Sequence, residues 1–436
     1  MAISSPPVNF FKREDFVFML VFYEWFIEFN DRKNIYYGQF CNYENAFTCD
    51  FFYHKEHKLH IESQEVYKRV NFRDFKFNFR AFPWEITLLS YPQLFLPSPA
   101  MKKKVLIIYT GGTIGMVRDH KTRTLVPFNF KAITDQIPEL KHLNCFISFH
   151  SSYRPIDSSN VQPTLWGELA GIIEKKYSSY DGFVILHGTD TMAYTASALS
   201  FMLENLGKPV ILTGSQLPLG VIRTDAKRNL ITSIEIASSK TVVPEVCVYF
   251  NSQLYRGNRV EKYTSSKFDA FHSLNYPALA EAGVEMIFDS SAILPKPKKK
   301  LKVHYGFDQH VAILKIFPGL TSNVIDALGH APGLKALIIE TFGSGNAPTT
   351  PKFLNSLQQL IKKGVIVLNV SQCSGGSVNQ TKYETGMGLQ NIGVISGGDM
   401  TTEAAVTKTM FLLARTKTRR EAVALLKQNL AGEISA

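Results

Sequence analysis

The chain has 436 residues, a length that suits two to three domains. Hydrophobic residues make up 45% and charged residues 19%, which is ordinary for a globular protein and excludes wholesale disorder. No run of 18 uninterrupted apolar residues occurs, so we expect no membrane-spanning helix. Five cysteines without a CxxC spacing favour a reducing compartment, and we expect a cytoplasmic protein.

The composition changes near residue 100. Residues 1–100 hold 26 of the 53 aromatic residues but only one glycine, Gly38, of 28. Because turns with positive φ need glycine, this segment is poorly suited to a compact fold. We expect either a poorly ordered extension or an upstream stretch translated from a wrongly assigned start, with Met101 as the true start. The alternative is an accessory segment that binds a partner through its aromatic side chains.

Residues 101–294 alternate short apolar runs with helical patterns. Apolar runs that end in glycine-rich turns predict buried strands, and Gly207 followed by a proline predicts the end of a helix. This alternation favours a parallel sheet covered on both faces. The predicted strands are 105–109, 183–186, 210–213 and 245–251, and the predicted helices are 191–206 and 229–238.

A proline- and lysine-rich stretch at 295–300 predicts a linker. Beyond it, strands are predicted at 311–316, 336–340 and 365–370, with helices at 353–362 and 402–415. The fold class is therefore α/β, with two α/β domains after the aromatic-rich segment 1–100. The larger, at 101–294, has a flavodoxin- or Rossmann-like parallel sheet, and the smaller spans 304–436.

Three glycine-containing loops follow predicted strands of the first domain, at 111–115, 188–191 and 214–216. Ligands of open α/β sheets bind outside the carboxyl ends of the strands, so these loops are the expected site. They present the hydroxyl groups of Thr113, Thr189 and Ser215, with Asp190 as the carboxylate among them. Glycine lets a substrate approach the backbone, and exposed N–H groups can hold an oxyanion.

A hydroxyl nucleophile needs an activating base. His187 precedes the second loop, but a histidine at the end of a strand is more often structural. Activation of a threonine by a carboxylate or a lysine then remains, with Lys262 as a candidate that local sequence supports only weakly. There is no G-x-S-x-G elbow.

Other ligand classes are less well supported. The loop at 111–115 is neither a G-x-G-x-x-G turn nor a Walker A loop, and no Cys/His cluster has zinc spacing. Residues 101–436 hold 37 Lys and Arg against 25 Asp and Glu, but no aromatic RNA-binding motif accompanies the lysine run. We therefore expect no metal, no cofactor and no nucleic-acid partner.

Residues 101–436 resemble the bacterial cytoplasmic (type I) L-asparaginases along nearly their full length. The resemblance is carried by many motifs in order. They are Tyr-Thr-Gly-Gly-Thr113-Ile-Gly-Met, Ile-Asp157-Ser158-Ser159-Asn, Leu-His-Gly-Thr189-Asp190-Thr, Leu-Thr-Gly-Ser-Gln216, Leu-Tyr-Arg-Gly-Asn-Arg-Val-Glu-Lys262, Gly-Ser-Gly-Asn346-Ala-Pro and Gln372-Cys373.

The resemblance implies hydrolysis of L-asparagine to L-aspartate and ammonia without a metal or cofactor. Carried over by motif, Thr113 is the nucleophile that forms a β-acyl-enzyme, while Thr189, Asp190 and Lys262 form a second catalytic group. Asp157, Ser158 and Ser159 hold the α-amino and α-carboxylate groups of the substrate, with Asp190 and Thr189 contributing to binding. The resemblance also implies a homodimer or a homotetramer.

The sequence departs from the family pattern at two positions. Leu125 stands about where the family has a tyrosine that helps to activate the nucleophile. Either another group takes the place of the tyrosine, or the enzyme is slow and its kcat rises in Leu125→Tyr. Glu340 stands about where some type I enzymes use an arginine, together with the Gln372-Cys373 motif, to bind asparagine at an allosteric site. We therefore expect hyperbolic kinetics. Asn346, as in related enzymes, is a candidate to reach a neighbouring subunit's site.

Two alternatives remain beside asparagine hydrolysis. One is the amidohydrolase subunit of a tRNA-dependent amidotransferase, which carries the same catalytic domain and an N-terminal extension. The other is a non-catalytic module that binds an amino acid. The sequence does not fix selectivity between asparagine and glutamine, because one methylene changes binding by only about 1–3 kcal/mol.

Overall fold

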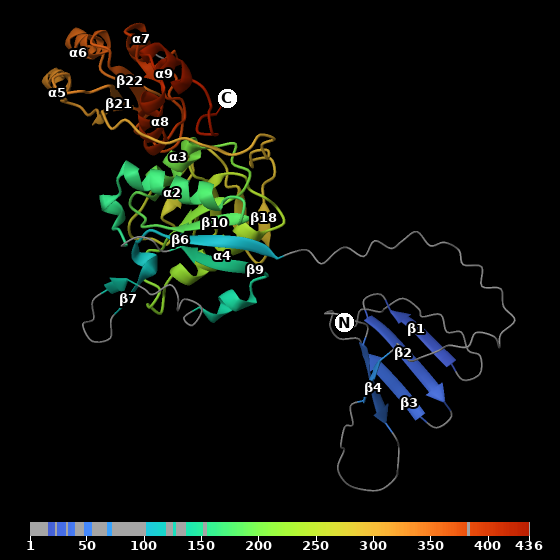
Figure 1. The fold of residues 1–436 in the computed structure, drawn as a ribbon. Helices are drawn as coiled ribbons and strands as arrows, with labels where there is room; N and C mark the ends of the chain where they lie inside the picture. Colours follow the sequence, from blue (N-terminus) through green and yellow to red (C-terminus); the bar gives the residue numbers. More distant parts are fainter. Residues whose placement is uncertain are drawn as a thin grey trace, which may run out of the picture. The chain divides into compact units, whose positions relative to one another are not determined.

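In the computed structural model the chain forms two compact units, Met1–Pro97 and Ser98–Ala436 (Figure 1). Within the first unit the described strands form an antiparallel sheet in the order β1-β2-β3-β4-β5. The two hypotheses for residues 1–100 stay predictions. The structure describes β1 (Phe16–Val21), β2 (Glu24–Asp31), β3 (Asn34–Gln39), β4 (Thr48–His54), β5 (Lys68–Asn71) and residues 102–118, 125–127, 137–150, 155–381 and 384–435.

The second unit begins with an eight-stranded sheet in the order β18-β17-β14-β13-β12-β10-β6-β9. The sheet has five parallel strands, β6, β9, β10, β12 and β13, of which all but β9 were predicted. The strands β14, β17 and β18 extend it with antiparallel pairs. Sequence analysis missed these last three strands, which are short and do not alternate with helices. The bounds are β6 (Lys103–Tyr109), β9 (Cys145–His150), β10 (Gly182–Leu186), β12 (Val210–Thr213), β13 (Val246–Phe250), β14 (Gln253–Arg256), β17 (Ala280–Ala282) and β18 (Met286–Phe288).

Helices cover both faces of this sheet. Along β6, Leu106 and Ile108 pack toward α2 (Pro163–Lys176) and α3 (Met192–Met202), while Val105 and Ile107 pack toward α4 (Ala226–Ser238). This alternation follows from the two-residue period of a strand, and every apolar residue of β6 is buried because both faces are covered.

The C-terminal domain is a four-stranded parallel sheet in the order β20-β21-β22-β23. Helices α5 and α6 cover one face and α8 covers the other. The bounds are β20 (Val311–Lys315), α5 (Ser322–Leu328), β21 (Ala336–Thr341), α6 (Pro351–Lys362), β22 (Ile366–Ser371), α7 (Glu384–Asn391), β23 (Ile395–Ser396), α8 (Thr402–Arg415) and α9 (Arg419–Leu426).

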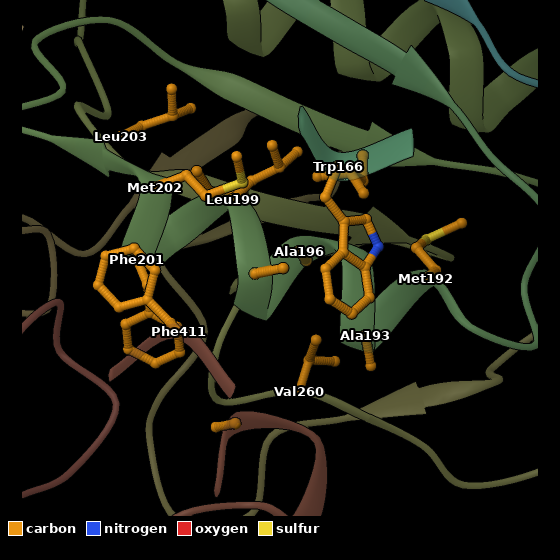
Figure 2. Packing of buried hydrophobic residues seen from close by; sticks show 14 of the residues in the cluster. Trp166, Met192, Ala193, Ala196, Leu199, Phe201, Met202, Leu203, Val260 and Phe411 are labelled. Atoms are coloured by element: carbon orange, nitrogen blue, oxygen red, sulfur yellow. The ribbon is translucent and has the colours of Figure 1, made fainter. Parts of the chain in front are cut away.

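One hydrophobic cluster runs through both domains of this unit. Helix α3 of the first domain packs against α8 of the second, and the rings of Phe201 and Phe411 stack with centroids 6.0 Å apart. Figure 2 shows these two rings side by side, with Leu199, Ala196 and Val260 in the same cluster. The two domains therefore share a buried core through α3 and α8.

One predicted helix ends earlier than expected. The pattern at 191–206 predicts a helix up to the glycine stop, but α3 ends at Met202. The next two residues form β11 (Leu203–Glu204), which pairs with β19 (Lys302–Val303) just after the lysine-rich linker. Asn205 then adopts a φ of 60°, which a helix cannot continue.

Among the described residues no helix is both long enough and apolar enough to cross a membrane.

Candidate active site

Two glycine loops meet at the carboxyl end of the sheet. Gly111 and Gly112, which follow β6, have φ values of 133° and 84°, and both conformations favour glycine. A methyl group on Gly112 would lie 2.5 Å from the Cα of Gly188. Because these glycines touch, the residues that follow them, Thr113 and Thr189, are brought to neighbouring positions.

The segment that carries Asp157, Ser158 and Ser159 joins the same place. The backbone N–H of Ile156 donates to the carbonyl of Thr110 at 2.9 Å. A methyl group on Gly188 would lie 2.5 Å from Oγ of Ser158, and the Thr191 hydroxyl donates to the Ser158 carbonyl at 2.7 Å. The structure thus gathers these predicted residues around one point.

Lys262 reaches the second loop from far along the chain. It lies on β15 (Glu261–Lys262), which pairs with β16 (Phe271–His272). Its Nζ donates to Oγ1 of Thr189 at 2.8 Å and to Oδ1 of Asp190 at 2.6 Å. Because a lysine only donates here, the Thr189 hydroxyl keeps its own proton available for another group. The Lys262 side chain is 17% exposed and that of Asp190 62%, so water reaches the pair from the side of the carboxylate.

Thr113 is positioned by its backbone. It begins the 3₁₀ helix η3 (Thr113–Gly115), and its carbonyl accepts a hydrogen bond from the N–H of Met116. The residue is half-buried, while Ile114 beside it is fully packed. The loop therefore presents Thr113 at the edge of a rigid turn.

Asp157, like Asp190, is an exposed carboxylate of the site. Its Oδ1 accepts hydrogen bonds from the N–H of Ser159 at 3.0 Å and from the Ser159 hydroxyl at 2.8 Å. These bonds stabilise the ionised form and lower the pKa of Asp157. Both bonds fall on Oδ1, which leaves Oδ2 available to a cation.

His187 is a buried structural residue, as the sequence favoured. It is 1% exposed, and burial lowers its pKa to about 4. Its Nδ1 donates to the carbonyl of Gly188 at 2.7 Å, so Nε2 accepts from the Thr195 hydroxyl at 3.0 Å. A neutral ring with both nitrogens engaged is unsuited to act as a base on either threonine.

Asp225 is a supporting residue that sequence analysis missed. Its buried carboxylate accepts the backbone N–H groups of Gln216 and Leu217 at 3.0 and 3.1 Å, and Nδ2 of Asn229 at 3.3 Å. It thereby holds the third glycine loop, in which a methyl group on Gly214 would lie 3.5 Å from Cγ2 of Thr189. In the sequence it stands at the start of a helix and is indistinguishable from an ordinary cap.

The residues at which the sequence departs from the family pattern, and those of the expected allosteric and subunit contacts, lie at the following places. Glu340, at the end of β21, accepts a hydrogen bond from the Thr402 hydroxyl at 2.7 Å and lies 3.7 Å from Nζ of Lys315. Cys373 is exposed two residues beyond β22. Asn346 closes a turn with Phe342. The Leu125 side chain lies outside the described residues, although its backbone begins β8 (Leu125–Pro127), which pairs with β7 (Met116–Arg118).

Comparison with known proteins matches these domains in order. Residues 104–294 match the model of the asparaginase N-terminal domain, and residues 310–426 match that of the glutaminase/asparaginase C-terminal domain. The chain is 43% identical over 338 residues to L-asparaginase 1 of Escherichia coli K12, across 77% of this chain and 98% of the relative. The chain belongs to the asparaginase family.

Solved and curated relatives show the breadth of the asparaginase family. The structure of L-asparaginase I from Vibrio cholerae is similar with a TM-score of 0.71 and 41% identity, across 77% of this chain and all of that one. A glutamyl-tRNA(Gln) amidotransferase component of Pyrococcus abyssi is 35% identical, across 76% of this chain and 77% of the relative. Several functions therefore share this asparaginase scaffold, and the site must decide between them.

Proposed function

We propose that the protein hydrolyses L-asparagine to L-aspartate and ammonia. The observation that carries this proposal is the paired hydrogen bonding of Lys262 to Thr189 and Asp190, beside the loop that presents Thr113. A zwitterionic amino acid needs both an anion and hydrogen-bond donors, and Asp157 with the neighbouring serine residues supplies them. The family membership of the chain and the names of its relatives support the same substrate.

The proposed reaction has two half-reactions. The Thr113 hydroxyl attacks the side-chain amide carbon, its proton passes to the leaving nitrogen, and ammonia departs to leave a β-aspartyl ester on Thr113. A water molecule, guided by Thr189, then attacks the ester, and its proton returns to Thr113 as aspartate is released. Lys262 and Asp190 orient the Thr189 hydroxyl and balance charge that develops on it.

Substrate binding is assigned to the segment that begins at Asp157. Its free Oδ2 pairs with the α-ammonium group of asparagine, with Asp190 as the second carboxylate. Ser158 donates toward the α-carboxylate, and the Ser159 hydroxyl, which donates to Asp157 in the structure, must turn away from Asp157 to do the same. The lowered pKa of Asp157 keeps this carboxylate ionised at and above neutral pH, so the ammonium contact is lost only when the pH falls below that pKa.

The test is ammonia release by the purified full chain, with asparagine and glutamine in parallel. We expect release with asparagine that falls by at least about 10³-fold in Thr113→Val and in Thr189→Val. A folded wild-type chain that binds asparagine by calorimetry without releasing ammonia would replace the proposal with the amino-acid-binding module. Leu125→Tyr belongs in the same series and is expected to raise kcat.

The amidohydrolase component of a tRNA-dependent amidotransferase is the second candidate. It is favoured by the similarity to the amidotransferase relatives and by the additional strand-rich unit that precedes the family domains. The same assay separates the two, because an amidotransferase component passes its ammonia to a partner protein. Release that requires a partner protein and tRNA would support it, whereas free turnover by the chain alone supports hydrolysis.

We also propose a cytoplasmic homodimer or homotetramer in which Asn346 serves a neighbouring subunit's site. The type I resemblance supports this assembly. Light scattering of the full chain measures it directly.

A further inference from the structure

The segment from Arg256 to Lys262 contacts the candidate site at one end and the last residues of the chain at the other. At one end Lys262 donates to the hydroxyl of Thr189 and the carboxylate of Asp190. At the other end Arg256, Asn258 and Arg259 point toward the C-terminus of the chain. Each of these three side chains bonds to residues 429–435, which we call the C-terminal clamp.

Three side chains of the segment bind the backbone of the clamp. Nδ2 of Asn258 donates to the carbonyl of Ala431 at 2.9 Å, and Nε of Arg259 donates to the carbonyl of Gly432 at 2.6 Å. Nη1 of Arg256 donates to the same Gly432 carbonyl at 3.4 Å. Arg259 is 2% exposed, so these bonds are shielded from water.

The clamp is held in place by Glu433, which bonds within the clamp and to α8. The Glu433 carboxylate accepts the N–H groups of Leu430 and Ala431 and pairs with Nζ of Lys408 on α8 at 2.6 Å. Both charged side chains are 0% exposed. A buried pair of this kind holds only in a tight geometry, because either charge alone is costly in the interior. The irregular last residues are therefore rigid without being a helix or strand.

Asp399 adds a second connection between the segment and the clamp. Its carboxylate pairs with Nη1 of Arg259 at 2.8 Å and accepts the N–H of Ser435 at 2.8 Å. Val260, the next residue toward the site, is fully buried in the cluster between α3 and α8 (Figure 2). Only Glu261 then separates this anchored stretch from Lys262.

We propose that the C-terminal clamp is a positioning element for Lys262, acting through Asn258 and Arg259. The catalytic role of Lys262 in this inference rests on the proposed function. The way in which Lys262 is positioned rests on the contacts described above. Lys262 must meet two acceptors at once, at 2.8 and 2.6 Å, and β15 has only two residues, so its own pairing cannot fix the lysine. The clamp supplies the missing constraint from a sequence distance of more than 160 residues.

Gly432→Ala is the sharpest test. Gly432 has a φ of 86°, and an added methyl group would lie 2.6 Å from Nη1 of Arg256. Arg256 cannot yield, because its guanidinium is bound to Glu245 at 2.5 Å and to the Ala292 carbonyl at 2.9 Å. The matched control is Gly319→Ala in an exposed turn, where φ is 92° and nothing lies within 4 Å. Both variants carry the same backbone strain, but only one displaces the clamp.

We expect kcat to fall about 10- to 100-fold in Gly432→Ala, with KM for asparagine nearly unchanged, since a displacement of about 1 Å can cost that much. The Gly319→Ala control retains the wild-type kcat. In a Lys262→Met background, Gly432→Ala has no further effect on kcat, which a general loss of structure would not reproduce. Equal kcat in the two glycine variants, or an equal fall in both backgrounds, overturns the proposal.

Lys262 can also be followed without turnover. Acetylation by acetic anhydride, mapped on the Lys262 peptide, is expected to be faster in Gly432→Ala than in Gly319→Ala, because the released lysine loses its two acceptors. Equal rates overturn the proposal even if the wild-type chain releases no ammonia, so the inference and the proposed function fail separately. If Gly432→Ala does not fold, Asn258→Ala takes its place, with the same expected changes in kcat and acetylation.

Discussion

The two threonines of the site follow neighbouring strands of one sheet, yet the structure holds them by different means. Thr189 is held by charge, through Lys262, which is itself paired with Asp190. Thr113 is held by its backbone, because it follows a glycine with a φ of 84° and its carbonyl accepts the N–H of Met116 at the end of a 3₁₀ helix. In the first loop the backbone position of the threonine is fixed, and in the second loop the hydroxyl is placed beside a charged pair. This difference suits a nucleophile and its assistant, and each of the following experiments breaks or sharpens it.

The largest effect should separate the two threonines themselves. With asparagine, Thr189→Val is expected to accumulate an aspartyl ester on Thr113, because attack of water is impaired more than the first attack. Thr113→Val should form no ester at all, and both variants should lose at least about 10³-fold in kcat. Mass spectrometry of the quenched enzyme locates the ester. An adduct on Thr189 in the Thr113→Val variant would reverse the two roles.

Removing the charge from the second loop is the next test. Lys262→Met should lower kcat by about 10²- to 10³-fold, in the range of a lost proton-transfer or charge-stabilising group. KM should change less than kcat, because Asp157 and its serine neighbours lie on another segment and only Asp190 loses a partner. Lys302→Met, which removes an exposed lysine from β19, is the control and should behave like the wild type. A wild-type kcat in Lys262→Met would remove the distinction between the loops.

His187 lies beneath both loops, and its effect should be on stability. Its pKa is about 4 in the folded chain and about 6.5 when unfolded, so the unfolded state binds more protons between these values. Folding stability is therefore lost as the pH falls below 6.5, by up to about 3 kcal/mol near pH 4. His187→Gln should remove this pH dependence, whereas the exposed His330→Gln should not. Denaturant melts across this pH range measure it, and an unchanged slope in His187→Gln would contradict the assignment.

Asp225 holds the third glycine loop, which packs beside Thr189. Asp225→Asn keeps the size of the side chain but removes the charge that receives two backbone N–H groups, so we expect a loss of about 1–2 kcal/mol in unfolding free energy. The fall in kcat should be smaller than that in Lys262→Met. Urea denaturation and steady-state kinetics on the same preparation give both numbers. A stability equal to that of the wild type would show that the carboxylate is not needed there.

The smallest effect concerns Glu340, which is remote from both threonine loops in the chain. Its carboxylate is occupied by Thr402 and lies near Lys315, and an acidic group repels the carboxylate of a second asparagine. The rate is therefore expected to depend hyperbolically on asparagine concentration, with Glu340→Gln giving the same curve shape. A Hill coefficient clearly above one for the wild type would contradict this expectation.

Much of the fold could be predicted because its elements carry strong local signals. The helix at 402–415 was predicted with its observed bounds, because acidic Glu403 marks its first turn and Arg415 its end. Sequence analysis missed the edge strand β9 and the short strands β14, β17 and β18. The last three do not alternate with helices, and that alternation is the pattern that identified the other strands. The loops that follow the predicted strands could be recognised as the expected site, and Thr113 and Thr189 in them as candidate catalytic residues. Lys262 and Asp225 reach those loops only through tertiary packing, which no local pattern encodes.

The cluster shared by α3 and α8 bears on how this chain can be recombined. The lysine-rich linker between the domains has no regular structure, which makes it an obvious junction for chimeric proteins built from two family members. An exchange at that point would separate Phe201 from Phe411 and replace only one side of a continuous packed surface. Interiors packed to this density tolerate compensated changes far better than single-sided ones. We therefore expect the two domains to be exchangeable only as a matched pair.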